Sequence, residues 1–288
     1  MSLTLVAVAA LAALVGVALG MLGGGGSIMM VPLLVYVAGV DKHQAIAMSL
    51  FVVGVTSLVG VIGHVRAGRV RWGIGLVFGA AGMAGAFVGG LLGSHLPGDL
   101  LLAAFALMML ATSFAMIRGR RERDGDAEVR PHVLRILLQG LAVGFVAGTV
   151  GAGGGFLIVP AMVFLAGLPM AAAVGTSLVV LTMQSLAGFA GYVSSVPIDW
   201  RLTLLVSGLA VVGSVVGAKL VGVVPGDLLR RGFGWFVLIL GALMLAEQVP
   251  GGYHWFAIGG AAAFIAVAVA CSTLVPSCPL TRRSAPSV

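Results

Sequence analysis

The sequence predicts an all-α membrane protein with several spanning helices. Hydrophobic residues make up 60% of the 288 residues, charged residues make up only 9%, and the mean hydropathy is +1.17. The apolar segments are close to the length that crosses a hydrocarbon layer about 30 Å thick, roughly 20 residues. The chain also contains 45 glycines, which suit helices that pack closely in a membrane. The lipid bilayer is therefore the first partner that the sequence predicts.

An internal duplication divides the chain. A shift of 128 residues aligns 20–101 with 148–229 without gaps, and 29 of the 82 aligned positions are identical. Transporters are commonly built from such repeats. We expect a first membrane repeat over 1–117 and a second over 132–247.

The first repeat begins with a helix that is broken by glycine. Residues 3–39 are apolar throughout, and one helix of that length would measure about 55 Å, too long for one crossing. The stretch LGGGGSIMMVP, residues 22–32, interrupts it, because glycine lets the backbone turn and proline removes a donor. We expect a helix before the glycine run, a leg of about 12 residues after it, and further helices over 43–65, 72–95 and 99–117.

The second repeat follows the same plan. A charged linker, RGRRERDGDAEVRP, occupies 118–131, and VGAGGGFLIVP at 150–160 then breaks the apolar stretch 133–168. Further helices are expected over 170–195, 201–222 and 228–246. The region 248–288 holds one extra apolar segment, 254–275, and a tail without a counterpart in the first repeat.

The distribution of Lys and Arg decides between two topologies. If each broken segment crosses once, the repeats are parallel, and the better orientation places 10 basic residues on one side and 6 on the other. If each break reverses the chain, the repeats are inverted and the split is 14 to 2, with only Lys42 and Arg201 on the poorer side. Basic residues favour the cytoplasmic side, so we expect inverted repeats with the N-terminus outside and the C-terminus in the cytoplasm.

The two glycine runs predict an anion site. Irregular backbone at membrane depth must be buried in protein or line a wet path. A half-helix starts after each run, and its N-terminus carries free N–H groups and partial positive charge. We expect the two N-termini to face one another near the midplane and to hold a small anion. Hydroxyl and amide groups nearby complete the prediction, and the candidate binding residues are Gly24, Gly25, Gly26, Ser27, Ser49, Gly153, Gly154, Gly155, Ser177 and Gln184.

Several other functions find no support in the sequence. No Asp, Glu, Lys or Arg lies in the middle of an apolar segment, so no proton-carrying carboxylate is visible. Catalytic, metal-ligand and cofactor-binding patterns are absent too, which predicts neither an enzyme nor a bound cofactor. The net charge of +7 comes mostly from short loops between apolar segments, so a nucleic-acid partner is not expected. His64 and Tyr192 occupy equivalent repeat positions near segment ends, where we expect interfacial anchors.

The two motifs resemble a known family. GMLGGGGSIMMVPLL followed by AIAMSL, repeated as GTVGAGGGFLIVPAM followed by AVGTSL, is similar to the TauE/SafE sulfite exporter family, also called TSUP permeases. The resemblance covers nearly the whole chain. It implies a prokaryotic inner-membrane permease for sulfite, organosulfonates or related anions.

We therefore expect a permease that moves a small anion by alternating access. An anion channel on the same scaffold is the alternative, and a homodimer is an assembly that the sequence leaves open.

Overall fold

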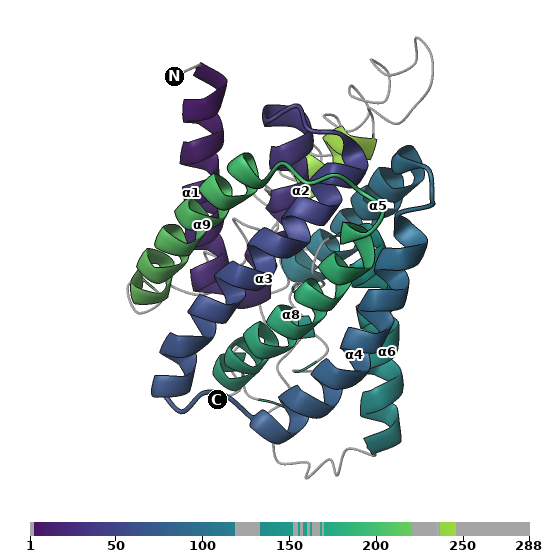
Figure 1. Ribbon diagram of the computed structural model, residues 1–288. Coiled ribbons are helices and arrows are strands. Elements are labelled where there is room, and N and C mark those ends of the chain that lie inside the picture. The colour runs from purple at the N-terminus through teal and green to yellow at the C-terminus, as the bar shows by residue number, and fades with distance from the viewer. Residues whose placement is uncertain are drawn as a thin grey trace, which may run out of the picture. The chain divides into compact units, whose positions relative to one another are not determined.

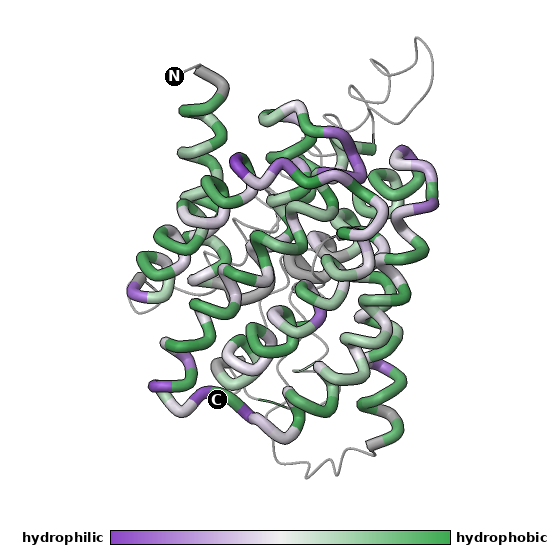
Figure 2. Tube along the Cα trace, viewed as in Figure 1, coloured by the Kyte–Doolittle hydropathy of each residue, from purple (hydrophilic) through white to green (hydrophobic). Residues whose placement is uncertain are grey.

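The structure is a computed structural model that describes residues 3–118, 133–151, 155, 158–159, 162, 168, 170–220, 235 and 237–245. Every regular element in these residues is a helix (Figure 1), which confirms the predicted all-α class. Within the described ranges, four helices are long and apolar enough to cross a membrane: Lys42–Arg66, Trp72–Gly93, Ala172–Val193 and Trp200–Lys219. Apolar residues dominate the helices, and hydrophilic residues gather mainly at their ends (Figure 2). Residues 119–131 of the predicted linker and the predicted C-terminal helix lie outside the described residues.

The helix bounds follow the predicted segments. Five predicted helices agree with the structure within two residues at each end. The helices are α1 (Leu3–Leu22), α3 (Lys42–Arg66), α4 (Trp72–Gly93), α5 (Gly98–Arg118), α6 (Val133–Val150), α8 (Met170–Val193) and α9 (Trp200–Leu220).

Two aspartates fix the starts of α3 and α9. The Asp41 carboxylate accepts from the backbone N–H groups two and three residues further on, at 3.0 and 3.5 Å. The Asp199 carboxylate makes the same pair of bonds at 3.0 and 3.2 Å. Each cap satisfies amides that a helix leaves unpaired, and its charge favours the positive end of the helix dipole.

The first glycine run folds the chain back on itself. It forms the 3₁₀-helix η1 (Gly23–Met29), which continues through α2 (Met30–Pro32) into the π-helix η2 (Leu33–Val37). Gly26 lies directly against the backbone of Ala18 and Leu19, and η2 contacts α1 again. Only a residue without a side chain allows that approach. The predicted break therefore exists, but the glycine run is coiled rather than open.

Close contacts divide the chain into two units. The first contains Met1–Leu101 and Asp124–Val224, and the second contains Leu102–Arg123 and Pro225–Val288. Within the second unit, Gly241 lies in the helical stretch 237–245 and approaches the Met109 side chain and the Ala106 carbonyl of α5. All the candidate site residues belong to the first unit. The domain boundaries expected from the repeats stay a prediction.

Glycines bring two pairs of helices into backbone contact. Along each seam, a Cβ on the glycine would overlap the backbone of the facing helix. The pairs are Gly16 with Ala210, Gly20 with Ser214, Gly213 with Ala13 and Gly217 with Val17 between α1 and α9, and Gly144 with Gly82, Gly148 with Ala86, Gly85 with Leu141 and Gly89 with Phe145 between α4 and α6. Residue numbers rise together along both seams, so α1 is parallel to α9 and α4 is parallel to α6. Under the 128-residue shift, each contact of one seam maps onto a contact of the other.

The equivalent helices α3 and α8 pack antiparallel. Gly54 lies against Leu186, Gly60 against Leu178, and His64 against Gly175, so the numbers rise on one helix as they fall on the other. An aromatic cluster of Phe51, Phe189 and Trp200 extends this contact, with ring centroids 5.2 to 6.1 Å apart. The helices α3 and α8 therefore form a central pair. The helix that follows each of them packs against the first helix of the other repeat, so that α4 contacts α6 and α9 contacts α1.

Candidate functional site

The two glycine runs begin at different levels along α3. Gly148, near the end of α6, lies 3.4 Å from the Cβ position of Gly188, which is also 3.4 Å from the Leu50 side chain. Near the end of α1, Gly20 touches Ser214, whose hydroxyl lies 3.4 Å from the Cβ position of Gly60. Leu50 and Gly60 are ten residues apart, which corresponds to about 15 Å along a helix.

The expectation that the two half-helix N-termini face one another near the midplane stays a prediction, because residues 152–154 of the second run lie outside the described residues. The first helices α1 and α6 end at different levels of the α3–α8 pair, because each is held parallel to a helix of the other repeat. Sequence periodicity carries no information on that exchange between repeats.

The first run is held between α1 and α8. Gly24 and Gly25 lie within η1, Gly26 is buried against α1, and Ser27 is fully buried. The helix α8 also packs against η1. A 3₁₀-helix bonds each N–H to the carbonyl three residues earlier. The backbone N–H groups within η1 therefore have acceptors in their own chain, so η1 does not present a row of free N–H groups.

The second run is anchored by a serine from the first repeat. Gly151 has a φ of +78°, and its N–H donates to the Ala147 carbonyl at 3.0 Å, which ends α6. The Ser49 hydroxyl lies 2.7 Å from the Gly151 carbonyl and 2.7 Å from the Ile46 carbonyl of its own helix. Gly155 is buried, whereas Gly153 and Gly154 lie outside the described residues.

Ser177, the repeat equivalent of Ser49, has a different set of contacts. It is fully buried, and its hydroxyl donates to the Val174 carbonyl of its own helix at 2.8 Å. That bond matches the one from Ser49 to Ile46. Ser49 makes a further bond, from its hydroxyl to the carbonyl of Gly151 in the second glycine run.

Four polar side chains form a central polar layer between the levels of the two runs. Its members are Thr56, Ser57, Gln184 and Ser185, all fully buried. Under the 128-residue shift, Thr56 corresponds to Gln184 and Ser57 corresponds to Ser185. Gly54 and Ser185 approach to 3.5 Å between the Cβ position and Cβ, so these parts of α3 and α8 lie at one depth. None of the polar side-chain atoms in this layer has a hydrogen-bond partner among the described residues.

Gln184 is the most polar member of the layer. Its amide nitrogen lies against Gly82 of α4, where a Cβ would overlap it. Neither its nitrogen nor its oxygen is bonded within the described part of the chain. Leaving such a group unmatched in the interior costs about 1–3 kcal/mol. A buried amide and three hydroxyls can therefore offer hydrogen bonds to a small polar solute without contributing a fixed charge.

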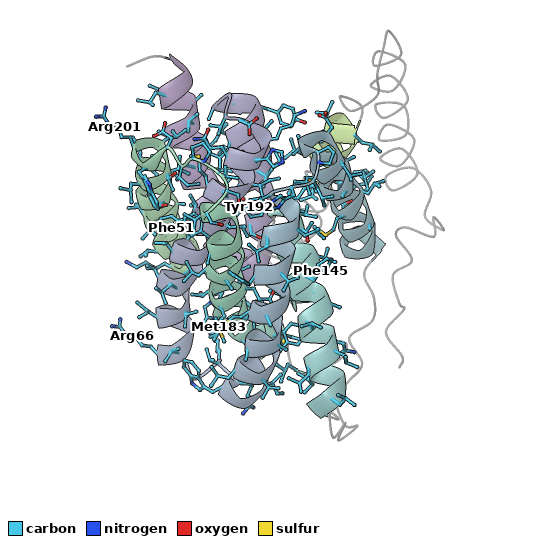
Figure 3. The ribbon with its side chains drawn as sticks, turned by 45° about the vertical axis from the view of Figure 1, so that its right-hand side comes forward. Phe51, Arg66, Phe145, Met183, Tyr192 and Arg201 are labelled. Atoms are coloured by element: carbon cyan, nitrogen blue, oxygen red, sulfur yellow. The ribbon has the colours of Figure 1, made fainter. Side chains whose placement is uncertain are left out.

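Two residues lie deeper than the sequence indicated. His64 is only 7% exposed and Tyr192 is fully buried, so neither is the interfacial anchor that was expected. The Tyr192 hydroxyl donates to the Thr149 carbonyl at 2.6 Å and thereby ties α8 to the end of α6. Figure 3 labels Tyr192 and Met183 at different levels of α8. The equivalence of His64 and Tyr192 under the 128-residue shift is the sequence signal that favours a buried position for both.

One further residue at the site was not anticipated. Gly82 is an ordinary helix glycine in the sequence, yet it leaves the space that the Gln184 amide occupies. Its repeat equivalent is Ala210, and that of Gln184 is Thr56. Gln184 is larger than its repeat equivalent, and its neighbour Gly82 is smaller than the repeat equivalent of that neighbour. This match can be recognised only from the contact between α4 and α8.

Comparisons with known proteins agree on one family. The family model described as sulfite exporter TauE/SafE matches residues 8–244. A probable membrane transporter protein of Xylella fastidiosa (strain 9a5c) is 38% identical over 212 residues, covering 72% of this chain and 79% of its own length. A second probable membrane transporter protein, from Xylella fastidiosa (strain Temecula1 / ATCC 700964), is 37% identical over 234 residues. The match covers 78% of this chain and 88% of that protein.

A more distant relative extends the match. The probable membrane transporter protein YdhB of Bacillus subtilis (strain 168) is 29% identical over 236 residues, which is 81% of this chain and 96% of that protein. No solved structure matches the chain.

Proposed function

The chain belongs to the TauE/SafE sulfite exporter family and is a multi-pass membrane transporter, and on this premise we propose that it carries a small, sulfur-containing anion by alternating access. The antiparallel packing of α3 and α8 supports repeats of opposite orientation. In such transporters one repeat or bundle rocks against the other around a site near the bilayer midplane. The proposed membrane is the inner membrane of a prokaryote.

The proposed path follows the α3–α8 pair. One glycine run begins toward each end of the pair, and the central polar layer lies between these two starting points. Ser49 and Ser177 are each positioned one to two turns from the layer, toward opposite ends. The anion would pass from one run to the other by way of the layer, and the candidate residues Gly24, Gly25, Gly26, Ser27, Gly153, Gly154 and Gly155 would border the two ends.

The observation that carries the proposal is the buried amide of Gln184. A transporter must compensate the lost hydration of its substrate with polar groups at membrane depth. Gln184 provides two such groups, and neither has a partner among the residues described. A purely structural glutamine would be expected to bond a neighbour.

The test compares two variants of α8 in proteoliposomes. Gln184→Met keeps the size of the side chain and removes both polar groups, so we expect sulfite exchange to fall about three- to tenfold, as the loss of a neutral hydrogen bond predicts. Thr182→Val is the control, because the Thr182 hydroxyl already donates to the Leu178 carbonyl at 2.8 Å. Both proteins must reach the membrane in equal amounts. Equal exchange by Gln184→Met and wild type would reject the proposed site.

The same vesicles distinguish a carrier from the channel alternative. A carrier exchanges faster when the far side contains substrate, because the loaded site returns more readily than the empty one. A channel shows no such trans-stimulation. We expect external sulfite to accelerate the efflux of labelled sulfite.

A further inference from the structure

The central polar layer presents an acceptor as well as donors. The Gln184 amide nitrogen can donate two hydrogen bonds, and its oxygen can accept. Both atoms are buried and unpartnered within the described residues. Exchanging the assigned positions of nitrogen and oxygen leaves one donor group and one acceptor, so the conclusion does not depend on that assignment. A fully ionised oxyanion could satisfy only the donors.

Among the residues that the structure describes, none places a compensating charge at the layer. The helix α4 has no ionisable residue. The one ionisable residue of α8 is Tyr192, which lies two turns from Gln184. In the other elements packed against α8, the titratable groups stand near helix ends: Lys42, His43, His64 and Arg66 on α3 and Arg135 on α6, with none in η1. The cost of transferring an ion into a medium of low polarity rises with the square of its charge, so a doubly charged anion is strongly disfavoured there.

Both observations select the same ligand chemistry. We infer that the site takes its oxyanion in a singly charged, proton-bearing form, such as hydrogensulfite, and this inference rests on the proposed function. The O–H of the ligand donates to the Gln184 oxygen, and its other oxygens accept from the amide nitrogen and from layer hydroxyls. The proton crosses with the anion and is released to water on the far side according to the acidity of the ligand. No carboxylate of the protein takes part.

Gly82 acts as a positioning residue for this recognition. A methyl group there would overlap the Gln184 amide nitrogen. Gly82→Ala therefore displaces the amide without changing its chemistry. We expect the variant to lose preference for the protonated ligand in the same direction as Gln184→Met.

Three anions separate charge from protonation. Proteoliposomes with a lumenal pH dye are given one of three radiolabelled anions, and entry is measured as trapped label. The anions are sulfite at two pH values around neutrality, methanesulfonate, which is singly charged without an ionisable proton, and sulfate, which is doubly charged. Protein-free vesicles correct for leakage of the neutral acid. We expect sulfite entry to rise as the pH falls and to acidify the lumen, methanesulfonate to enter several-fold more slowly, and sulfate to stay out.

The variants complete the test. In Gln184→Met and Gly82→Ala the advantage of hydrogensulfite over methanesulfonate should shrink to less than about twofold, whereas Thr182→Val should keep it. The inference is overturned if sulfate enters as fast as sulfite, if sulfite entry rises with pH, or if Gln184→Met retains the full preference. Transport of sulfate that depends on Gln184 would reject the inference and leave the proposed function standing. If no anion enters faster than into protein-free vesicles, both are rejected.

Discussion

At the scale of single residues, the junction between Ser49 and Gly151 shows how one repeat fixes the other. Gly151 needs a positive φ, and a Cβ there would overlap the Ile46 side chain of α3. The Ser49 hydroxyl bonds the carbonyl of the same glycine. Backbone conformation, close packing and a hydrogen bond therefore all depend on this one position, at the end of α6.

Gly151→Ala should destabilise the protein more than the same change at Gly68. Gly68 also has a positive φ, +66°, but nothing lies within 4 Å of its Cβ position. Gly68→Ala therefore measures the backbone strain alone, about 1–2 kcal/mol. Gly151→Ala adds the overlap with Ile46, so its thermal unfolding temperature in detergent should fall clearly further. Equal shifts for the two variants would show that the contact with Ile46 carries no weight.

The sequence predicted the polarity of the site better than its geometry. Ser49, Ser177 and Gln184 stood out as polar residues in apolar segments, and all three are buried. Whether a hydroxyl is already bonded depends on which helix lies opposite, and that is decided by tertiary packing. For this reason the sequence could not separate Ser177, bonded within α8, from Gln184, which has no partner among the described residues.

At the scale of helices, small residues decide which elements touch. The seams between α1 and α9 and between α4 and α6 bring backbones so close that only glycine fits at the crossing positions. Membrane helices lack a strong hydrophobic drive to associate and depend on such close packing. The seams are therefore the main determinants of the arrangement within the first unit.

Two glycines on one helix test this view. Gly213 of α9 lies against the Ala13 carbonyl, whereas Gly208 on the same helix has open space around it. Gly→Ala in a helix normally gains about 1 kcal/mol. We expect Gly208→Ala to raise the unfolding temperature slightly and Gly213→Ala to lower it, because overpacking costs about 1–3 kcal/mol. A stabilised Gly213→Ala protein would contradict the seam.

Helix bounds were predictable and helix winding was not. Loops with charged or capping residues such as Asp41 and Asp199 interrupt long apolar stretches, and this contrast is plain in the sequence. The glycine run at 23–26 was expected to be a simple break, but it forms a 3₁₀-helix. Glycine permits both conformations, and the contact of Gly26 with α1, far from any local signal, selects between them.

At the scale of the whole molecule, the orientation of the first unit in the membrane is an expectation from charge. Arg66 and Arg201 lie toward opposite ends of the bundle (Figure 3). The 14-to-2 division of basic residues assigns Arg66 to the cytoplasm and Arg201 to the outside. Antiparallel α3 and α8 agree with the inverted repeats on which that division depends.

Cysteine labelling checks this orientation. In a background in which Cys271 and Cys278 are replaced by serine, an impermeant thiol reagent applied to spheroplasts should label Arg201→Cys and leave Arg66→Cys unlabelled. Both side chains are exposed in the structure, so access is limited by the membrane alone. Labelling of Arg66→Cys after lysis provides the control. The reverse pattern would overturn the assigned orientation.

The parallel pairing of α1 with α9 has a consequence for biosynthesis. Gly16 and Gly20 meet their partners only at Ala210 and Ser214, so the first helix enters the bilayer long before its companion is synthesised. Until then its glycine-lined face must be covered by lipid, by the insertion machinery or by a transient neighbour. A ribosome that stalls before α9 would leave α1 unpaired, and such truncated chains should be preferred substrates for membrane proteases.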